Sequence, residues 1–236
     1  MKYIAVPDAV DRPLTFYLAM EEYVAAAYGC GFFVWRVAPT VIIGRNQDLN
    51  SEVNLQFCRE HGVNVVRRKS GGGCVYADMG NLMLSYITED KGVEAVFAVF
   101  LEKLAAVLRL LGMDAVRTAH NDILVGGAKV SGNAFFNLTY GSIVHGTLLH
   151  SVDFEALEKA VTPPAEKLAK HGVQSVRQRV ANLRELGLQL SVEELSKVLE
   201  HAFCDGRRLL EPSELAKIEE LEKSYTDPSF ILGKAL

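Results

Sequence analysis

The segment "RRKSGGGCVYADMGN", residues 67–81, places two arginines and a lysine directly before three consecutive glycines. A run of glycines lets backbone N–H groups turn inward and approach a ligand with no Cβ in the way, as in anion-binding loops. Residues 63–68 read as a β-strand, so Arg67 and Arg68 should point to opposite faces and only one should reach an anion. Residues 74–87 alternate and are rich in β-forming residues, so the glycines are expected to join strand to strand.

The residues of this segment also bear on two other interpretations, a P-loop and a glycine-rich turn. The Walker A pattern requires a lysine followed by Ser or Thr and then a helix, and residues 70–81 have neither, which disfavours a P-loop NTPase. A glycine-rich bulge or hairpin with solvated arginines fits the stretch equally well, because glycine runs are weak signals.

The rest of the chain mixes helices and strands without a regular βαβ alternation. Periodicity and capping signals predict helices over 12–28, 50–62, 92–112, 153–161, 191–203 and 212–225, and strands over 32–37, 40–44, 63–68, 74–87, 114–118, 122–136 and 140–150. The strand region 122–136 should bend into a hairpin at Gly126–Gly127, and Ser191 with Glu194 forms a capping-box pattern. The predicted fold class is α+β, with mixed, mainly antiparallel sheets flanked by helices.

Composition narrows the class of protein further. The chain has 236 residues, 49% hydrophobic and 23% charged, which suits a single compact domain. The net charge of -4 argues against nucleic acid as a partner. The four cysteines show neither CxxC pairing nor disulfide density, and no apolar run is long enough for a signal peptide or a membrane span. We therefore expect a cytoplasmic protein with no membrane partner.

A second group of polar residues lies in the predicted hairpin. Asn121 and Asp122 head its first strand, and Lys129, Ser131 and Gly132 lie in its second. A hairpin can bring Lys129 and the Asn121 side-chain amide to the same end of a binding pocket. The small residues around the lysine leave room for a ligand at its ammonium group. On its own, this pattern is also compatible with an exposed hairpin lysine.

Several blocks, in order along the chain, resemble the catalytic domain of the lipoate-protein ligase A family. These blocks are "FVWRVAPTVIIGRNQ", "VVRRKSGGGCVYADMGNLMLSYI", "NDILVGGAKVSGNAFF", "VHGTLLHSVDFEAL" and "SVRQRVANL". The resemblance implies a biotin/lipoate-ligase-like fold, with residues 1–236 forming one catalytic domain. It also implies an enzyme that activates lipoate with ATP, with Mg²⁺ present, to lipoyl-AMP and transfers the lipoyl group to a lysine of a carrier domain.

The resemblance carries roles to individual positions. Lys129 would be the catalytic residue bridging the lipoyl carbonyl and the α-phosphate, and Asp122 would meet the phosphate or its Mg²⁺. Residues implied in binding substrate or nucleotide are Arg68, Ser70, Gly71, Gly72, Gly73, Cys74, Val75, Tyr76, Asn121, Asp122, Ser131, Gly132, His145 and Thr147. An attack of a carboxylate on the α-phosphate gathers negative groups, so such a site needs positive charge and N–H donors.

Other assignments stay open at the level of sequence. For His145, a role within the sheet competes with ligand contact. The apolar chain of lipoate needs an apolar pocket, and Val41, Ile43 and Leu84 are expected to line it. Cys74 beside Arg68 would suit an octanoyl or lipoyl transferase that uses a cysteine thioester instead of ATP. A non-catalytic lipoyl- or nucleotide-binding subunit, and a biotin ligase, are further alternatives.

The implied partners follow from the same resemblance. They are lipoyl carrier domains of 2-oxoacid dehydrogenases or the glycine-cleavage H protein. Many members of the family carry a small C-terminal accessory domain, and residues 225–236 resemble the approach to it. The expectation is a chain without that domain, which either works alone or receives it as a separate accessory subunit.

Overall fold

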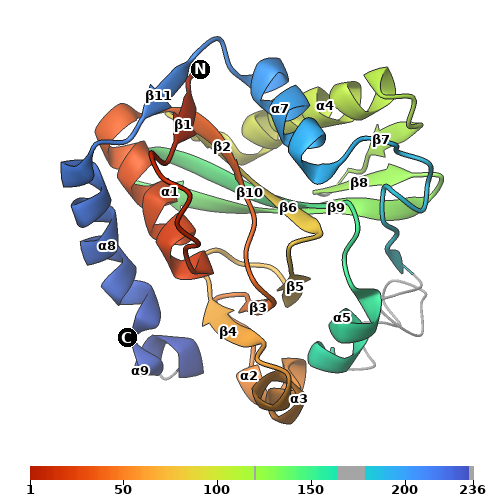
Figure 1. Ribbon diagram of the computed structural model, residues 1–236. Coiled ribbons are helices and arrows are strands. Elements are labelled where there is room, and N and C mark those ends of the chain that lie inside the picture. Colours follow the sequence, from red (N-terminus) through yellow and green to blue (C-terminus); the bar gives the residue numbers. More distant parts are fainter. Residues whose placement is uncertain (120, 164–178, 234–236) are drawn as a thin grey trace.

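The fold is described from a computed structural model of residues 1–236, of which residues 1–119, 121–163 and 179–233 are placed well enough to describe. Two sheets and the helices around them form the molecule (Figure 1). Part of the last block of resemblance, residues 175–178, lies outside the described residues. Within the described residues, no helix is both long enough and apolar enough to cross a membrane.

The larger sheet forms the centre of the molecule and is mainly antiparallel. Its strands, in spatial order, are β11 (Arg207–Leu209), β1 (Tyr3–Ala5), β2 (Gly31–Trp35), β6 (Asn81–Thr88), β10 (Gly141–Leu149), β9 (Ala128–Leu138), β8 (Asp122–Val125) and β7 (Ala115–Arg117). The pairs β11–β1 and β1–β2 are parallel, and the other pairs are antiparallel. The predicted α+β class with mainly antiparallel sheets is confirmed.

The smaller sheet carries the arginine–glycine segment. It contains β4 (Asn64–Arg67), β3 (Thr40–Ile43) and β5 (Val75–Ala77), in that order, with β3 parallel to β4 and antiparallel to β5. The glycines therefore join one strand to another, as predicted. The predicted strand over 74–87 is instead two strands, because a turn at Asp78–Gly80 separates β5 from β6.

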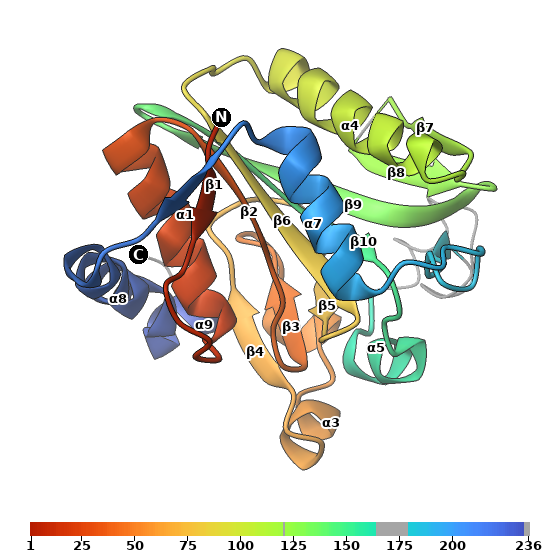
Figure 2. The same cartoon turned by 45° about the horizontal axis from the view of Figure 1, so that its top comes forward.

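Helices cover both faces of the larger sheet (Figure 2). They are α1 (Leu14–Tyr28), α4 (Val93–Leu110), α7 (Val192–Phe203) and α8 (Pro212–Thr226), with the shorter α2 (Leu49–Glu52), α3 (Leu55–Glu60), α5 (Phe154–Ala160) and α9 (Pro228–Leu232) at the periphery. Helices α4 and α7 share one apolar core with the sheet, and α1, α8 and α9 contribute to another on its opposite face. Burial of these two apolar layers is the main force that holds the sheet and helices together.

One predicted helix was wrong. The sequence predicts a single helix over 50–62, but the chain forms α2 and α3, which are separated at Val53. Val53 is extended, with φ -130° and ψ 129°, and pairs with Val161 in an isolated antiparallel bridge. Asn54 then caps α3 by accepting a hydrogen bond from the Phe57 N–H at 3.0 Å. Packing of Val53 against a distant segment overrides the local helical pattern.

The predicted hairpin is confirmed. Gly126 and Gly127 both have positive φ, 57° and 83°, between β8 and β9. This is the left-handed conformation that a two-residue hairpin turn needs at both central positions, and glycine adopts it without a steric penalty. The capping box of Ser191 and Glu194 at the start of α7 is also present.

Candidate functional site

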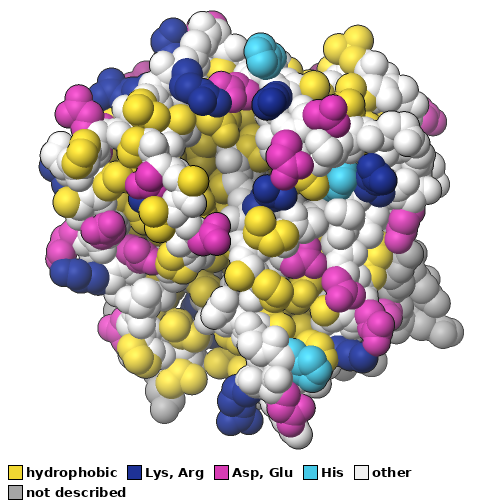
Figure 3. All heavy atoms as spheres, viewed as in Figure 1, with side chains coloured by type: hydrophobic (Ala, Val, Ile, Leu, Met, Phe, Trp, Pro, Cys, Tyr) yellow, Lys and Arg dark blue, Asp and Glu magenta, His cyan; other side chains and the backbone are white. Residues whose placement is uncertain are grey.

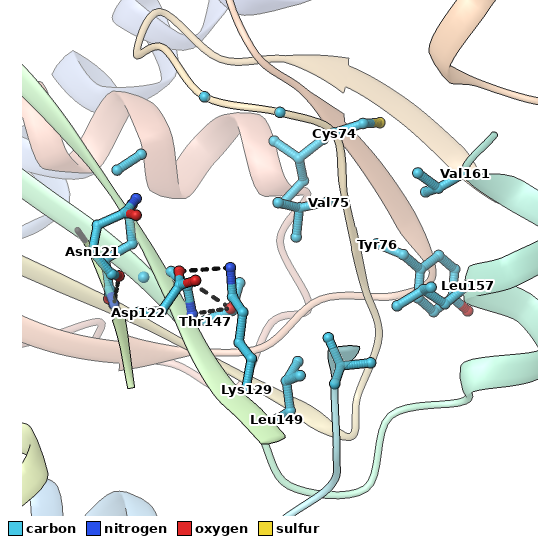
Figure 4. Close-up of a pocket in the computed structure, with 18 of the residues that line it drawn as sticks. Cys74, Val75, Tyr76, Asn121, Asp122, Lys129, Thr147, Leu149, Leu157 and Val161 are labelled. Atoms are coloured by element: carbon cyan, nitrogen blue, oxygen red, sulfur yellow. Dashed lines mark hydrogen bonds and ion pairs between the residues drawn. The ribbon is translucent and has the colours of Figure 1, made fainter. Parts of the chain in front are cut away.

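A cavity of about 480 Å³ opens between the two sheets. Its lining combines polar groups with an apolar wall, within the size range of small-molecule sites. Figure 4 shows part of this lining, including Lys129 and Asp122 facing each other across a short gap. On the face shown in Figure 3, acidic and basic side chains are interspersed, without a broad basic field.

Most of the residues predicted for the site are brought together here. The cavity is lined by Arg68, Gly72, Gly73, Cys74, Val75, Tyr76, Asn121, Asp122, Lys129, Gly132, His145 and Thr147 from the prediction. Ser70, Gly71 and Ser131 are not among the lining residues. Ser70 and Ser131 are buried behind the surface, at 2% and 0% exposure.

Arg68 forms a buried corner beside the glycines. Its guanidinium donates to the Ser70 Oγ at 3.1 Å, to the Gly71 and Gly73 carbonyl oxygens at 2.8 Å each through Nη2, and to the Ile42 carbonyl oxygen at 3.2 Å. All of these acceptors are neutral, although the side chain is only 5% exposed. Burial lowers the pKa of Arg68 to about 10, so the group stays charged near neutral pH. A buried cation held by neutral acceptors is suited to an anionic ligand.

Arg67 points away from the cavity, as the strand alternation predicts. Its guanidinium donates to the carbonyl oxygens of Gly44, Arg45 and Gln47 at 2.9–3.1 Å, and to the Ile231 carbonyl oxygen of α9 at 3.0 Å. The side chain is 2% exposed. The two neighbouring arginines therefore have different roles: Arg68 faces the cavity, and Arg67 ties the end of β4 to the C-terminal helix.

The glycine loop approaches another backbone segment closely. A Cβ at Gly44 would lie 2.0 Å from the Gly72 carbonyl oxygen, so only glycine fits at this position. Gly72 has φ +94°, which side-chain-bearing residues rarely adopt. Close packing of the two segments holds the loop over Arg68.

Lys129, Asp122 and Arg179 form a charged cluster on the side of the cavity formed by the hairpin. Lys129 Nζ lies 2.7 Å from Asp122 Oδ1, and Arg179 Nη2 lies 2.5 Å from Asp122 Oδ2. Burial lowers the pKa of Lys129, and the charge of Asp122 opposes that effect. A Cβ at Gly132 would come within 2.6 Å of Lys129 Cε and Nζ, so this glycine provides the room for the lysine head group. Two cations share one carboxylate, which leaves a net positive charge in the cluster.

Asn121 and Thr147 are held by the backbone around this cluster. The Asn121 side-chain amide donates to the Asn133 carbonyl oxygen, and the Asn133 side-chain amide donates to the Asn121 carbonyl oxygen at 2.8 Å. Thr147 Oγ1 accepts from the Gly132 N–H at 3.3 Å. These contacts fix the start of β8 against β9 and β10, and so fix the position of Asp122 opposite Lys129.

His145 belongs to a buried network and also lines the cavity. Its Nε2 lies 2.6 Å from Ser70 Oγ, and its Nδ1 lies 2.9 Å from Glu21 Oε2 on helix α1. Both interpretations of this histidine therefore describe part of its position: it is hydrogen-bonded within the core, and its ring borders the cavity.

The predicted apolar walls were wrong by one residue in each strand. Val41, Ile43 and Leu84 lie in packed cores away from the cavity, whereas their neighbours Ile42 and Met83 line it. Side chains alternate between the two faces of a strand, and a choice of the wrong face shifts the whole set. The remaining apolar lining is Ala134, Leu149, Leu157, Val161, Pro163 and Val180.

Besides Glu52, which lies in the predicted helix over 50–62 and also lines the cavity, two charged residues of the site were missed from the sequence. Arg179 lies in one of the blocks of resemblance, but nothing in its spacing links it to Asp122, which is 57 positions earlier. Glu21 lies within the regular helical pattern of α1, where an acidic residue is ordinarily solvated. In the structure it is 2% exposed. Only the tertiary arrangement identifies both residues.

Cys74 lines the cavity on the same side as the glycine loop. The thiol is half-buried and free of any disulfide. In the view of Figure 4 its sulfur points away from Lys129 and Asp122. Among the described residues, no group of three or more His, Cys, Asp or Glu side chains could hold a metal ion on its own. The carboxylates that line the described part of the cavity are Asp122 and Glu52.

The fold and the cavity together define an α+β ligand-binding or catalytic domain with two separate cationic groups at one site. The profile of the lipoyl protein ligase A/B catalytic domain matches residues 13–204. The chain belongs to this family.

Curated relatives agree with this assignment. A lipoate–protein ligase 1 from Staphylococcus aureus is 40% identical, over 84% of this chain and 62% of the relative. A lipoate-protein ligase A from Psychrobacter cryohalolentis is 34% identical, over 95% of this chain and 66% of the relative. The chain thus spans less than two thirds of the length of these curated relatives.

The fold matches solved lipoate-protein ligases at low sequence identity. A bi-partite lipoate protein ligase from Thermoplasma acidophilum, studied with its E2 lipoyl domain, has a TM-score of 0.86 at 24% identity and covers 100% of this chain and 97% of its own. A lipoate-protein ligase A solved with ATP has a TM-score of 0.85 at 23% identity, with 99% of both chains covered. These likenesses establish the fold.

Proposed function

We propose that this protein is a lipoate-protein ligase that activates lipoate with ATP and transfers the lipoyl group to a lysine of a carrier domain. The observation that carries the proposal is one cavity that joins the buried Arg68 corner, the Lys129–Asp122–Arg179 cluster and an apolar wall. The family membership and the names of relatives at 34–40% identity point to the same activity.

The first step suits the charges of the cavity. A lipoate carboxylate oxygen attacks the α-phosphorus of ATP, the bond to the bridging oxygen breaks, and pyrophosphate leaves. Arg68 and the loop N–H groups stabilise the phosphate charge, and the Lys129 ammonium stabilises the carboxylate and then the acyl-phosphate oxygens. Ile42, Met83 and Leu149 offer apolar contacts for the lipoyl chain.

The second step uses the same lysine. The ε-amine of the carrier lysine attacks the acyl carbonyl carbon, the carbon–oxygen bond to AMP breaks, and the amine loses a proton. Lys129 would stabilise the oxyanion that forms during the attack. No covalent bond to the enzyme is needed, so Cys74 has no required part in this mechanism.

Mg²⁺ is part of the proposal. Mg²⁺ is commonly held by one or two carboxylates together with substrate phosphates, and Asp122 with Glu52 supplies two carboxylates to this cavity. Asp122 would exchange its contact with Arg179 or Lys129 for the metal. Addition of a chelator should therefore abolish adenylate formation, and excess Mg²⁺ should restore it.

We further propose that residues 1–236 act as one catalytic domain, and that the acceptors are lipoyl domains of 2-oxoacid dehydrogenases or the glycine-cleavage H protein. In the solved archaeal system the partner of the ligase is an E2 lipoyl domain. Whether an accessory subunit is needed is tested by running the reaction with and without the C-terminal portion of a longer relative. A cytoplasmic location remains a prediction from the sequence.

The donor experiment tests the proposal against its main rival. The purified protein is offered lipoate with ATP and Mg²⁺ in one reaction and octanoyl carrier protein without ATP in another, each with an acceptor domain and with the accessory portion present or absent. The ligase forms lipoyl-AMP and lipoylated acceptor only in the first reaction. Product only in the second reaction would identify an acyl transferase, and no product in either would favour a non-catalytic binding subunit.

A further inference from the structure

Four successive side chains around the glycine loop alternate between two sets of contacts. Arg67 and Lys69 face the C-terminal helices: Lys69 Nζ lies 2.7 Å from Glu22 Oε1 and 4.4 Å from the ring centre of Tyr225. Arg68 and Ser70 face the other way, where Ser70 meets His145. From His145 the contacts continue to the buried carboxylate of Glu21, for which the proposed reaction has no role.

We propose that Glu21 is a positioning residue of the phosphate-binding corner, and that it orients the Arg68 guanidinium through His145 and Ser70. The chain of contacts is continuous. Arg68 Nε lies 3.1 Å from Ser70 Oγ, Ser70 Oγ lies 2.6 Å from His145 Nε2, and His145 Nδ1 lies 2.9 Å from Glu21 Oε2. All four side chains are buried, with exposures between 2% and 8%.

With an ionised Glu21 and a neutral His145, the donors in this chain have one consistent direction. An ionised Glu21 only accepts, so His145 must donate through Nδ1–H. A neutral imidazole then accepts at Nε2, and the Ser70 hydroxyl donates to it. The remaining lone pairs of Ser70 Oγ are thereby turned towards Arg68, whose Nε–H donates to this oxygen. The contact of Glu21 with His145 thus orients the Ser70 oxygen that accepts from Arg68.

Glu21 is itself held rigidly from its other side. Ser85 Oγ donates to Glu21 Oε1 at 2.6 Å, and the Trp35 indole N–H donates to Ser85 Oγ at 2.8 Å. Both carboxylate oxygens are therefore occupied by donors, which limits the side chain to one orientation. A carboxylate buried at this depth is costly unless it is hydrogen-bonded and balanced. The nearest cation along the network is Arg68, whose direct contacts are neutral oxygens.

A serine, a histidine and a glutamate in this order also match the arrangement of a nucleophilic serine. Two observations argue against that role. Ser70 is 2% exposed and is not one of the residues that line the cavity, and its oxygen already accepts from Arg68. The same contacts suit a fixed support behind the site.

The substitution Glu21→Gln tests the network with little change of shape. A glutamine can accept from only one of the two donors, because its other terminal atom is itself a donor. Ser85 Oγ already accepts from Trp35 and needs an acceptor for its own proton, so the glutamine oxygen stays with Ser85 and the amide N–H group faces His145. His145 would then exchange its tautomer and donate to Ser70, which frees the Ser70 hydroxyl and weakens its fixed contact with Arg68. The matched control is Glu214→Gln on α8, a glutamate 8% exposed that accepts from Tyr23 and Tyr28.

The kinetic experiment rests on the proposed function. Glu21→Gln should lower kcat/KM for ATP in adenylate formation by about tenfold, and Ser70→Ala should do the same. Because Glu21 acts through Ser70, the double variant should be no worse than Ser70→Ala alone. Effects of the two substitutions that multiply, or an acylated Ser70 found by mass spectrometry, would overturn the proposal.

Hydrogen exchange on the ligand-free protein gives a readout that does not depend on activity. Glu21→Gln should speed amide exchange in residues 70–76, while Glu214→Gln leaves those amides as in the unchanged protein. Equal exchange at 70–76 in both variants would contradict the positioning role. If the protein forms no adenylate at all, the proposed function fails but the exchange result still decides the role of Glu21.

Discussion

Arg67 and Arg68 are adjacent in sequence and make different contacts, because a strand turns successive side chains to opposite faces. Arg68 borders the cavity, and Arg67 bonds to four carbonyl oxygens, one of them in α9. The alternation was predictable from the sequence. Which of the two arginines faces the ligand, and what the other holds, depended on the resemblance and on the tertiary structure.

Replacement of each arginine by alanine should separate the two roles. Arg68→Ala should raise KM for ATP in adenylate formation at least tenfold, because an anion contact is lost, and it should also lower the melting temperature, because the buried carbonyl oxygens of Ile42 and Gly73 lose their donor. Arg67→Ala should lower the free energy of unfolding by about 2–4 kcal/mol, because several buried carbonyl oxygens lose their donor. Thermal unfolding and adenylate kinetics on both variants check this, and an equal increase of KM for ATP in the two variants would contradict it.

Lys129 is the residue on which the proposed chemistry most depends. Lys129→Ala should reduce adenylate formation by roughly 10²–10³, the range measured for loss of one oxyanion-stabilising donor. Circular dichroism should show an unchanged fold. The control is Lys159→Ala, since Lys159 lies in an exposed ion pair with Glu155 on α5. A Lys129→Ala protein with normal adenylate formation would remove this residue from the mechanism.

Cys74 distinguishes the ligase from the thioester transferase. Cys74→Ser should keep most of the ATP-dependent activity, because the thiol lines the cavity but takes no part in either proposed step. A thioester mechanism instead requires the sulfur as nucleophile. Loss of acyl transfer in this variant, with the fold intact, would select the transferase.

At the scale of elements, long periodic segments were predictable and short or tertiary ones were not. The helices α1, α4, α7 and α8 follow from their apolar spacing and caps. Strands β1 and β11 were missed, because each has three residues and forms by parallel pairing with segments distant in sequence: β1 with β2 and β11, and β11 with β1. The cavity needs the hairpin and the arginine–glycine loop side by side, which is a property of strand order rather than of local sequence.

Helix α9 should support the glycine loop through Arg67, which donates to the Ile231 carbonyl oxygen of this helix. Phe230 is 9% exposed and packs edge to face on Tyr225, while the next carbonyl, of Ile231, accepts from Arg67. Phe230→Ala should lower the free energy of unfolding by about 3 kcal/mol and raise KM for ATP severalfold. Leu232→Ala on the same helix is the control, because Leu232 is 50% exposed. A change in stability without any change in KM would show that α9 does not influence the loop.

At the scale of the whole molecule, the cavity exists because the two sheets, which share one apolar core, both contribute residues to its lining. The larger sheet contributes Asp122 and Lys129 through β8 and β9, and the smaller sheet contributes Arg68 at the end of β4. Residues 54 or more positions apart therefore converge on one ligand-sized space. The blocks of resemblance predicted this convergence, whereas the hairpin pattern alone favoured an exposed hairpin lysine.

The measurement that tests the central claim most directly follows an oxygen atom from lipoate to AMP. The protein is incubated with ATP, Mg²⁺, an acceptor lipoyl domain and lipoate labelled with heavy oxygen in its carboxylate, and the released AMP is analysed by mass spectrometry. Adenylation predicts AMP that carries one heavy oxygen, because the carboxylate oxygen bonded to phosphorus stays with AMP when the acyl group leaves. Lipoylated acceptor formed with unlabelled AMP, or with no AMP at all, would contradict the account.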